Sequence, residues 1–304
     1  MTSTIAPREE RRLLGIMLTL LAYVLFTAID SSAKWLAQAG IPTMEFIFVR
    51  YAVHLGLILG LFLPGRGVAL FRSGNRKLEV LRGLFLLSTT FFNFLAVQFL
   101  PLTVTGSIAF TMPLLLCALS VPLLGETVGW RRWTAIGVGF LGVLIIVRPG
   151  TDAFHPAALL SLMGAAGSAC YFILTRKLSA IDSAATQQFY AGAVAMLCVA
   201  PFAFGSWVWP ATAVDWFAFA LIGVAGFAGH QLSTIALRFA PATVLAPFAY
   251  FQIIYMTLSS WLVFAQPPDA WIFLGAPVVI GSGLYIWLRE RRLAKPVTPV
   301  AKAE

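Results

Sequence analysis

Long apolar runs are the feature that most constrains what this chain can fold into. Hydrophobic residues make up 60% of the 304 residues and charged residues only 11%, against about 45–50% and about 25% in soluble domains. Most of the runs approach the roughly 20 residues that an α-helix needs to cross a bilayer. We therefore expect an all-α integral membrane protein with ten transmembrane helices. The ten runs cover about 13–36, 43–63, 78–100, 102–123, 133–149, 156–177, 184–206, 214–237, 242–264 and 270–289.

The positions of Lys and Arg predict how these helices are oriented. Seventeen of the 21 basic residues lie in the tails or the even-numbered connections, whereas the odd-numbered connections hold only Arg148. Lys and Arg favour the cytoplasmic side of a membrane, so both termini are expected inside. The net charge of +9 follows from this pattern and does not call for a nucleic-acid partner. The seventeen residues are Arg8, Arg11, Arg12, Arg66, Arg72, Arg76, Lys77, Arg131, Arg132, Arg176, Lys177, Arg238, Arg289, Arg291, Arg292, Lys295 and Lys302.

The two halves of the chain are similar to each other. A shift of 140 positions aligns the third to fifth runs with the eighth to tenth and places Pro101-Leu102-Thr103-Val104 on Pro241-Ala242-Thr243-Val244. Five helices is an odd number, so the second copy is expected to be inverted, with a binding site near the bilayer midplane between the copies. The alternative is chance similarity between apolar helices. The expected segments are an N-terminal tail 1–12, a first repeat 13–149, a second repeat 156–289 and a C-terminal tail 290–304.

Several short motifs follow one another along nearly the whole chain. They are the late basic residues Lys34 and Lys177, Phe48-Val49-Arg50-Tyr51, Pro113, Leu124-Gly125-Glu126-Thr127 and Arg148-Pro149-Gly150. Together they resemble the drug/metabolite transporter superfamily, specifically its EamA-like ten-helix members with two EamA repeats. The second repeat departs from the family pattern, because Ala265-Gln266 replaces its Gly-Glu pair and the seventh run contains no Arg.

The resemblance implies a secondary active transporter that moves a small organic metabolite across a bacterial cytoplasmic (inner) membrane by alternating access. Leu81-Arg82-Gly83 and Asp30 are most similar to branches with S-adenosylmethionine and riboflavin importers. Amino acids, vitamins and nucleoside derivatives are therefore the expected substrate types. We expect a monomer, with a homodimer as the alternative. No cofactor or metal is expected, since the sequence has neither a phosphate-binding Gly-rich loop nor a metal-ligand cluster.

Charged residues inside the predicted spans are candidate site residues, because placing one at a helix centre costs about 2.5–3.5 kcal/mol on insertion scales. Asp30 and Lys34 are four residues apart and share a helical face. Asp30 and Arg50 fall at similar depths in adjacent helices. This predicts an Asp30–Arg50 ion pair, with Lys34 as a further partner. The alternative is a purely structural pair that joins two helices.

Other polar and aromatic side chains are expected to complete a cavity. His54 lies one turn from Arg50, Asn93 is at the level of Asp30, and His230 falls in the inner third of its helix. A single histidine in a packed bundle is more often a hydrogen-bonded core residue than a ligand. Aromatic rings could line the cavity for a flat or apolar substrate. The expected substrate-binding residues are Asp30, Lys34, Arg50, His54, Asn93, Phe110, Tyr171, His230, Tyr250 and Gln252.

Four residues are expected to act in gating or coupling. Arg82, near the inner end of its helix, would snorkel or close a cytoplasmic gate, and Asp30 with the histidines suggests protons as the coupling ion. Pro113 and Pro247 are expected to loosen their helices, and a merely tolerated kink is the alternative.

Two other classes of protein compete with a transporter. An integral-membrane enzyme acting on a lipid or lipid-linked substrate would need Asp30, His54 and His230 around one reacting centre. The expected depths place Asp30 and His230 far apart, which counts against it. A channel is disfavoured because the sequence shows no rings of like charge.

Overall fold

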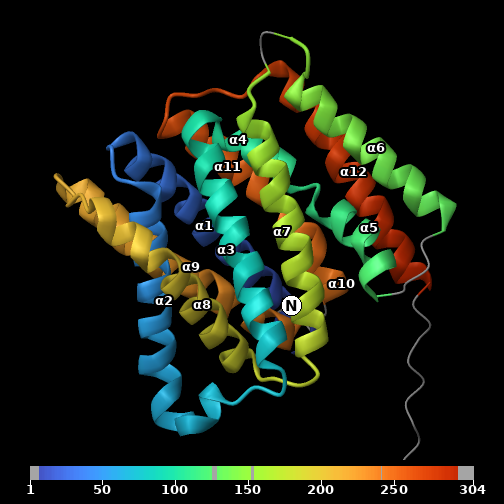
Figure 1. Cartoon of the computed structure of the whole chain (residues 1–304). Helices are drawn as coiled ribbons and strands as arrows, with labels where there is room; N and C mark the ends of the chain where they lie inside the picture. The colour runs from blue at the N-terminus through green and yellow to red at the C-terminus, as the bar shows by residue number, and fades with distance from the viewer. Residues whose placement is uncertain (1–6, 125–128, 152–153, 241, 294–304) are drawn as a thin grey trace, which may run out of the picture.

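A computed structural model describes residues 7–124, 129–151, 154–240 and 242–293, and in these ranges the chain is all-α, without a strand (Figure 1). Residues 1–6 and 294–304 of the expected tails, and residues 125–127 of the motif that begins at Leu124, lie outside the described residues. Three short 3₁₀ turns accompany the helices: η1 (Gly67–Phe71), η2 (Phe204–Ser206) and η3 (Ala246–Tyr250). The helices are α1 (Pro7–Gln38), α2 (Thr43–Arg66), α3 (Arg76–Phe99), α4 (Leu102–Ala109), α5 (Met112–Leu124), α6 (Trp130–Val147), α7 (Ala157–Leu178), α8 (Ala184–Ala203), α9 (Ala213–Phe239), α10 (Ala242–Leu245), α11 (Phe251–Leu262) and α12 (Ala270–Leu293).

Eight segments of the described chain are long and apolar enough to cross a membrane, and they match the first six, the eighth and the tenth predicted spans. The seventh span forms a helix, α8, whose first turn carries the polar residues Thr186, Gln187 and Gln188. The ninth is divided among α10, η3 and α11, each of which is too short to span a bilayer alone. The prediction of ten spans is thus confirmed in part.

The fourth and ninth spans are both interrupted. The fourth breaks between α4 and α5 at Phe110 and Thr111, directly before Pro113, which lacks the N–H that a continuous helix would need there. In the ninth, Pro247 stands in the first turn of η3. The helices are thus interrupted close to both prolines. Phe110 and Tyr250 occupy aligned positions of the two halves, and their ring centroids lie 5.1 Å apart.

The bundle is built from pairs of helices that come from opposite halves. The most extensive contacts join α1 to α9, α3 to α7, α2 to α8 and α6 to α12, and α4 packs on α11. Figure 1 shows α6 and α12 side by side along one edge of the molecule. Exchanging the halves converts the α1–α9 pair into the α7–α3 pair and returns each of the other pairs to itself.

Close contacts between α6 and α12 repeat this exchange at single residues. A Cβ atom on Gly139 would collide with Ser282 Oγ, and one on Gly142 would lie 2.9 Å from Val279 Cγ2. The shift of 140 positions converts the first pair of positions into the second. Small residues thus bring the two helices together at corresponding points.

A second reciprocal contact joins the other helices of the bundle. A Cβ on Gly83 of α3 would lie 2.9 Å from Val194 Cβ of α8, and a Cβ on Gly223 of α9 would lie 2.5 Å from Val53 Cβ of α2. Gly83 and Gly223 are 140 positions apart, and the two valines are one position further apart. Each contact therefore has a counterpart in which the halves have changed places.

Candidate functional site

Polar side chains cross the largest core of the protein, which lies among α1, α2, α3, α8 and α9. Asn93 Nδ2 donates a hydrogen bond to Asp30 Oδ1 over 2.7 Å, and Arg50 Nη1 donates one to Thr90 Oγ1 over 2.7 Å. Thr90 and Asn93 are three residues apart and share one face of α3. One helix therefore holds a carboxylate and a guanidinium from two different helices. We call Asp30, Arg50, Thr90 and Asn93 the central cluster.

The predicted Asp30–Arg50 ion pair is wrong. In the part of the chain that the structure describes, no ion pair joins the two groups, although they interact electrostatically. Each is bonded instead to a neutral side chain of α3. The depth of a residue along its helix predicts its level in the membrane but not the direction in which its side chain points around the helix axis. In the structure the Arg50 side chain points toward Thr90.

The guanidinium of Arg50 is fixed by its surroundings. It lies 5.2 Å from the ring centroid of Tyr51 and 5.4 Å from that of Phe94, within the range of cation–π attraction. The hydroxyls of Tyr51 and Thr90 are 2.6 Å apart, so the acceptor of the Arg50 hydrogen bond is itself held in place. Arg50 is 9% exposed, and this packing leaves its side chain little freedom to move.

The two predicted histidines lie near the central cluster and near each other. The rings of His54 and His230 are 6.3 Å apart, and His230 also contacts Phe26, one turn before Asp30 on α1. His54 Nε2 and Gln188 Oε1 are buried without a hydrogen-bond partner among the described residues. His230 therefore contacts the turn of α1 that precedes Asp30.

Lys34 is placed elsewhere, at the end of α3. Its Nζ donates a 2.6 Å hydrogen bond to the carbonyl of Leu100, and it lies 5.4 Å from the ring of Phe264. The last carbonyls of a helix lack partners and favour a positive charge. The structure therefore gives Lys34 a capping contact on α3 and no bond to Asp30.

Arg82 and Tyr171 form a further network, nearer the start of α3 than Thr90 and Asn93. The guanidinium of Arg82 is buried and donates to Thr175 Oγ1 (2.7 Å), the carbonyl of Gln187 (2.8 Å) and the Tyr171 hydroxyl (2.8 Å). Glu79 lies 3.7 Å away. Arg82 thus joins α3 to α7 and α8 and does not snorkel toward a membrane surface.

The remaining predicted residues lie around the break in the ninth span. Tyr250 contacts Phe110 and places its hydroxyl against Gly283 of α12, and Gln252 follows, half-buried, in the first turn of α11. The hydroxyls of Ser31 and Ser259, 2.6 Å apart, join α1 to α11. This group therefore flanks α1 on the side of α11.

Sequence reasoning missed Thr90, Tyr51 and Gln188. Thr90 could have been found, because it shares the helical face of Asn93. Tyr51 neighbours Arg50 in the sequence but looks like any other buried aromatic. Gln188 stands in the first turn of its span, where polar residues are ordinary. No group of three or more His, Cys, Asp or Glu in the described ranges could hold a metal ion.

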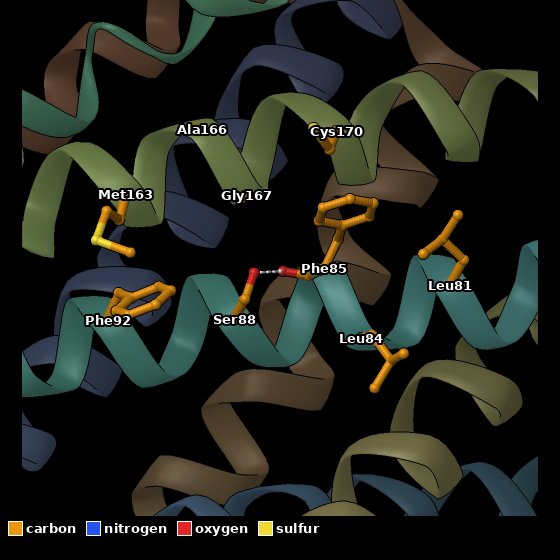
Figure 2. Close-up of a pocket in the computed structure, with 9 residues that line it drawn as sticks. All are labelled: Leu81, Leu84, Phe85, Ser88, Phe92, Met163, Ala166, Gly167 and Cys170. Atoms are coloured by element: carbon orange, nitrogen blue, oxygen red, sulfur yellow. Dashed lines mark hydrogen bonds between the residues drawn. The ribbon is translucent and has the colours of Figure 1, made fainter. Parts of the chain in front are cut away.

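A groove on the outside of the bundle differs from the central cluster in character. It has a volume of about 460 Å³ and lies between α3 and α7 (Figure 2). Figure 2 shows Phe85 and Phe92 on α3 opposite Met163 and Cys170 on α7, with the hydroxyl of Ser88 bonded back to the carbonyl of Phe85 (2.8 Å). Its walls are apolar, and exposed Leu81, Leu84 and Met163 border it, as expected of a surface that faces lipid.

A bundle of membrane-spanning helices from two similar halves around buried charges is typical of an integral membrane transporter. The model of the EamA-like transporter family matches residues 13–148 and 155–288, so this chain belongs to that family. The family resemblance predicted from the sequence is confirmed. The protein is a transporter and not an enzyme.

Named relatives cover nearly the full chain. It is 26% identical to the S-adenosylmethionine uptake transporter of Rickettsia prowazekii over 281 residues, or 91% of this chain and 94% of that protein. It is 30% identical to the riboflavin transporter of Vibrio cholerae, covering 94% and 99%, and to the pseudopaline exporter CntI of Pseudomonas aeruginosa, covering 88% and 93%. A crystal structure that is 20% identical shares the fold, with a TM-score of 0.60 over 94% of this chain and 99% of that chain.

Proposed function

We propose that this protein is a secondary active transporter that moves a small organic metabolite across the bacterial cytoplasmic membrane by alternating access. The observation that carries the proposal is the central cluster. Charged groups within a bilayer are costly and are usually found where they serve transport. Asp30 and Arg50 make no direct ion pair and are each bonded to a neutral side chain, so their burial is poorly explained as a simple ion pair that joins two helices.

We further propose that the two halves are inverted repeats with both termini in the cytoplasm. The reciprocal contacts at Gly83 and Gly223, and at Gly139 and Gly142, support a two-fold relation between the halves. Because each half contributes five spans, such an axis would lie in the membrane plane. The Lys and Arg distribution supports the cytoplasmic placement of both ends.

Closure toward the cytoplasm would involve the connection before α3 and the turn between α7 and α8. Ser73 Oγ donates to Asp182 Oδ2 (2.6 Å), and the Gly74 amide donates to Asp182 Oδ1 (2.8 Å). The Arg82 network lies one to two turns further along α3. These bonds join the first half to the second on the face that the charge pattern assigns to the cytoplasm.

Closure toward the outside would involve the corresponding segments of the opposite halves. Trp35 Nε1 at the end of α1 donates to Asp215 Oδ1 at the start of α9 (2.9 Å). The amide of Val208, before α9, donates to Glu45 Oε2 at the start of α2 (2.8 Å). Alternating access would break the outer and the inner bonds in turn, and a substrate shifts that equilibrium only by binding one state better than the other.

The relatives suggest the substrate types but not the direction of transport. Their names include uptake of S-adenosylmethionine, transport of riboflavin and export of pseudopaline. We propose an amino acid, vitamin or nucleoside derivative as substrate, protons as the coupling ion through Asp30, His54 and His230, and a monomer as the transporting unit.

Counterflow in proteoliposomes tests the proposal. The full-length protein is reconstituted and preloaded with unlabelled S-adenosylmethionine, riboflavin or a standard amino acid, and entry of the same labelled compound is followed. We expect saturable, transient accumulation of at least one compound, which a carrier produces and a channel does not. Absence of counterflow for every compound, or flux that does not saturate, would contradict the proposal.

Variants of the buried titratable groups test proton coupling. Asp30→Asn, His54→Gln and His230→Gln are compared in uptake driven by an imposed pH gradient, with the surface variant Asp269→Asn as the matched control. We expect Asp30→Asn to abolish accumulation above equilibrium while Asp269→Asn behaves like the native protein. If all three interior variants still concentrate substrate, the coupling scheme is wrong.

A further inference from the structure

The central cluster presents one negative and one positive group, each with unused hydrogen-bonding capacity. Asn93 occupies Asp30 Oδ1, and Thr90 occupies Arg50 Nη1. Within the described ranges no other hydrogen bond reaches Asp30 Oδ2 or the Nε and Nη2 atoms of Arg50. Asp30 is also partly accessible although it lies in the middle of the bundle. A purely structural role therefore does not account for all the polar atoms of the cluster.

A ligand of matching charge would complete it. An ionised group in a low-dielectric interior is stable only when its remaining hydrogen bonds and its charge are satisfied. A purely anionic ligand would satisfy Arg50 and be repelled by Asp30, and a purely cationic ligand would do the reverse. A neutral ligand would leave both charges without an opposite charge in direct contact. A ligand that carries both charges close together satisfies both groups at once.

We propose, resting on the transport function proposed above, that this cluster binds the α-amino-acid end of a zwitterionic substrate. The substrate ammonium would bind Asp30 Oδ2, and its carboxylate would bind the free N–H groups of Arg50. Thr90 and Asn93 would hold the two protein charges apart, so that they engage the ligand and not each other. The rings of Tyr51 and Phe94 keep the guanidinium in place for this contact.

Matched ligands provide the first test. Binding to the purified full-length protein is measured by melting temperature and by equilibrium titration with the standard amino acids and S-adenosylmethionine. Each compound that binds is compared with its methyl ester or decarboxylated form, which lacks the carboxylate, and with its N-acetyl form, which lacks the ammonium. We expect either deletion to weaken binding by about tenfold or more, because a buried charge of the protein loses its partner.

Combining these ligands with protein variants makes the assignment specific. Arg50→Gln should weaken the zwitterion by about tenfold or more and leave the decarboxylated ligand unaffected, and Asp30→Asn should do the same for the N-acetyl ligand. Arg148→Gln and Asp269→Asn, which remove an ion pair at the protein surface, serve as matched controls and should change neither affinity. If Arg50→Gln does not fold, Arg50→Lys replaces it. This variant keeps the positive charge but lacks the planar, forked set of donors, so it should also weaken binding of the zwitterion.

The outcomes separate this inference from the transport proposal. Equal affinity for a zwitterion and its charge-deleted forms would overturn the inference. So would counterflow of riboflavin, which has no α-amino-acid group, without counterflow of any zwitterion, and the protein would then still be a transporter. If no compound of either kind shows counterflow, the transport proposal fails and the inference fails with it.

Discussion

At the scale of single residues, Lys34 is a motif position whose contacts differ from the role expected of it. It was predicted to bind substrate, and its hydrogen bond to the Leu100 carbonyl instead predicts a role in stability. Lys34→Met keeps an unbranched side chain that is one atom shorter and leaves that carbonyl without a donor. We expect a loss of about 1–3 kcal/mol in stability, seen as a lower melting temperature in detergent, with substrate affinity retained.

Its counterpart in the second half provides the control. Lys177 donates to the carbonyl of Leu123 in an exposed position, where water replaces the lost bond. Lys177→Met should therefore leave the melting temperature nearly unchanged. An unchanged melting temperature in Lys34→Met together with lost substrate affinity would contradict the capping role and favour substrate contact.

The sequence predicts which residues matter in the core better than it predicts their partners. Asp30, Arg50, His54 and Asn93 stand out because a bilayer tolerates such side chains only in protein or water, and the structure brings them to one region. Their bonding could not be predicted, because it depends on how each helix is rotated about its axis. Thr90, which accepts the hydrogen bond from Arg50, is an ordinary residue in an apolar run.

At the scale of elements, the contacts that close each face predict two positions where the protein can be locked. A cysteine pair at Ser73 and Asp182 would join the connection before α3 to the turn after α7, and a pair at Trp35 and Asp215 would join α1 to α9. In a protein without its native cysteines, a short reducible thiol cross-linker at either pair should abolish counterflow, because alternating access needs each closure to open. Reduction should restore it.

Single-cysteine variants treated with the same reagent are the control for that prediction and should retain counterflow. If a fully cross-linked protein still transports, the contact in question does not open during the cycle. The two pairs are independent, so one closure can be rejected while the other is kept.

Helix boundaries were predictable where a residue type enforces them. Pro113 marks the break between α4 and α5, and the seventh predicted span begins at Ala184 as α8 does. The division of the ninth span into α10, η3 and α11 was not foreseen beyond a kink at Pro247, since its apolar run is continuous in sequence. In this segment the side chains make tertiary contacts, such as that of Tyr250 with Phe110, which the apolar run does not reveal.

At the scale of the whole molecule, the self-similarity of the chain predicts which positions correspond but not which ones meet. The shift of 140 residues aligns Phe110 with Tyr250, and in the structure these two residues touch. Residues that correspond and also touch must lie near the axis that relates the halves. The position of that axis is determined by how the two halves pack together. The sequence therefore indicates two copies but not which of their faces are in contact.

The proposed topology makes a prediction that distinguishes ten spans from eight. If α8 and the ninth span cross the membrane, residue 211 between α8 and α9 lies outside with residue 151, and the tail at residue 302 lies inside. If only the eight segments that are both long and apolar enough cross, residue 211 moves to the cytoplasm while the other two positions keep their sides. We therefore expect a membrane-impermeant thiol reagent to label Ala211→Cys and Thr151→Cys in intact cells.

Lys302→Cys should be labelled only after the membrane is permeabilised, and the chain without native cysteines sets the background. Labelling at residue 151 without labelling at residue 211 would mean that α8 does not cross, and the second half would then lack its five spans. Labelling of the tail in intact cells would place the termini outside, and the two-fold axis in the membrane plane would lose the support of the charge distribution.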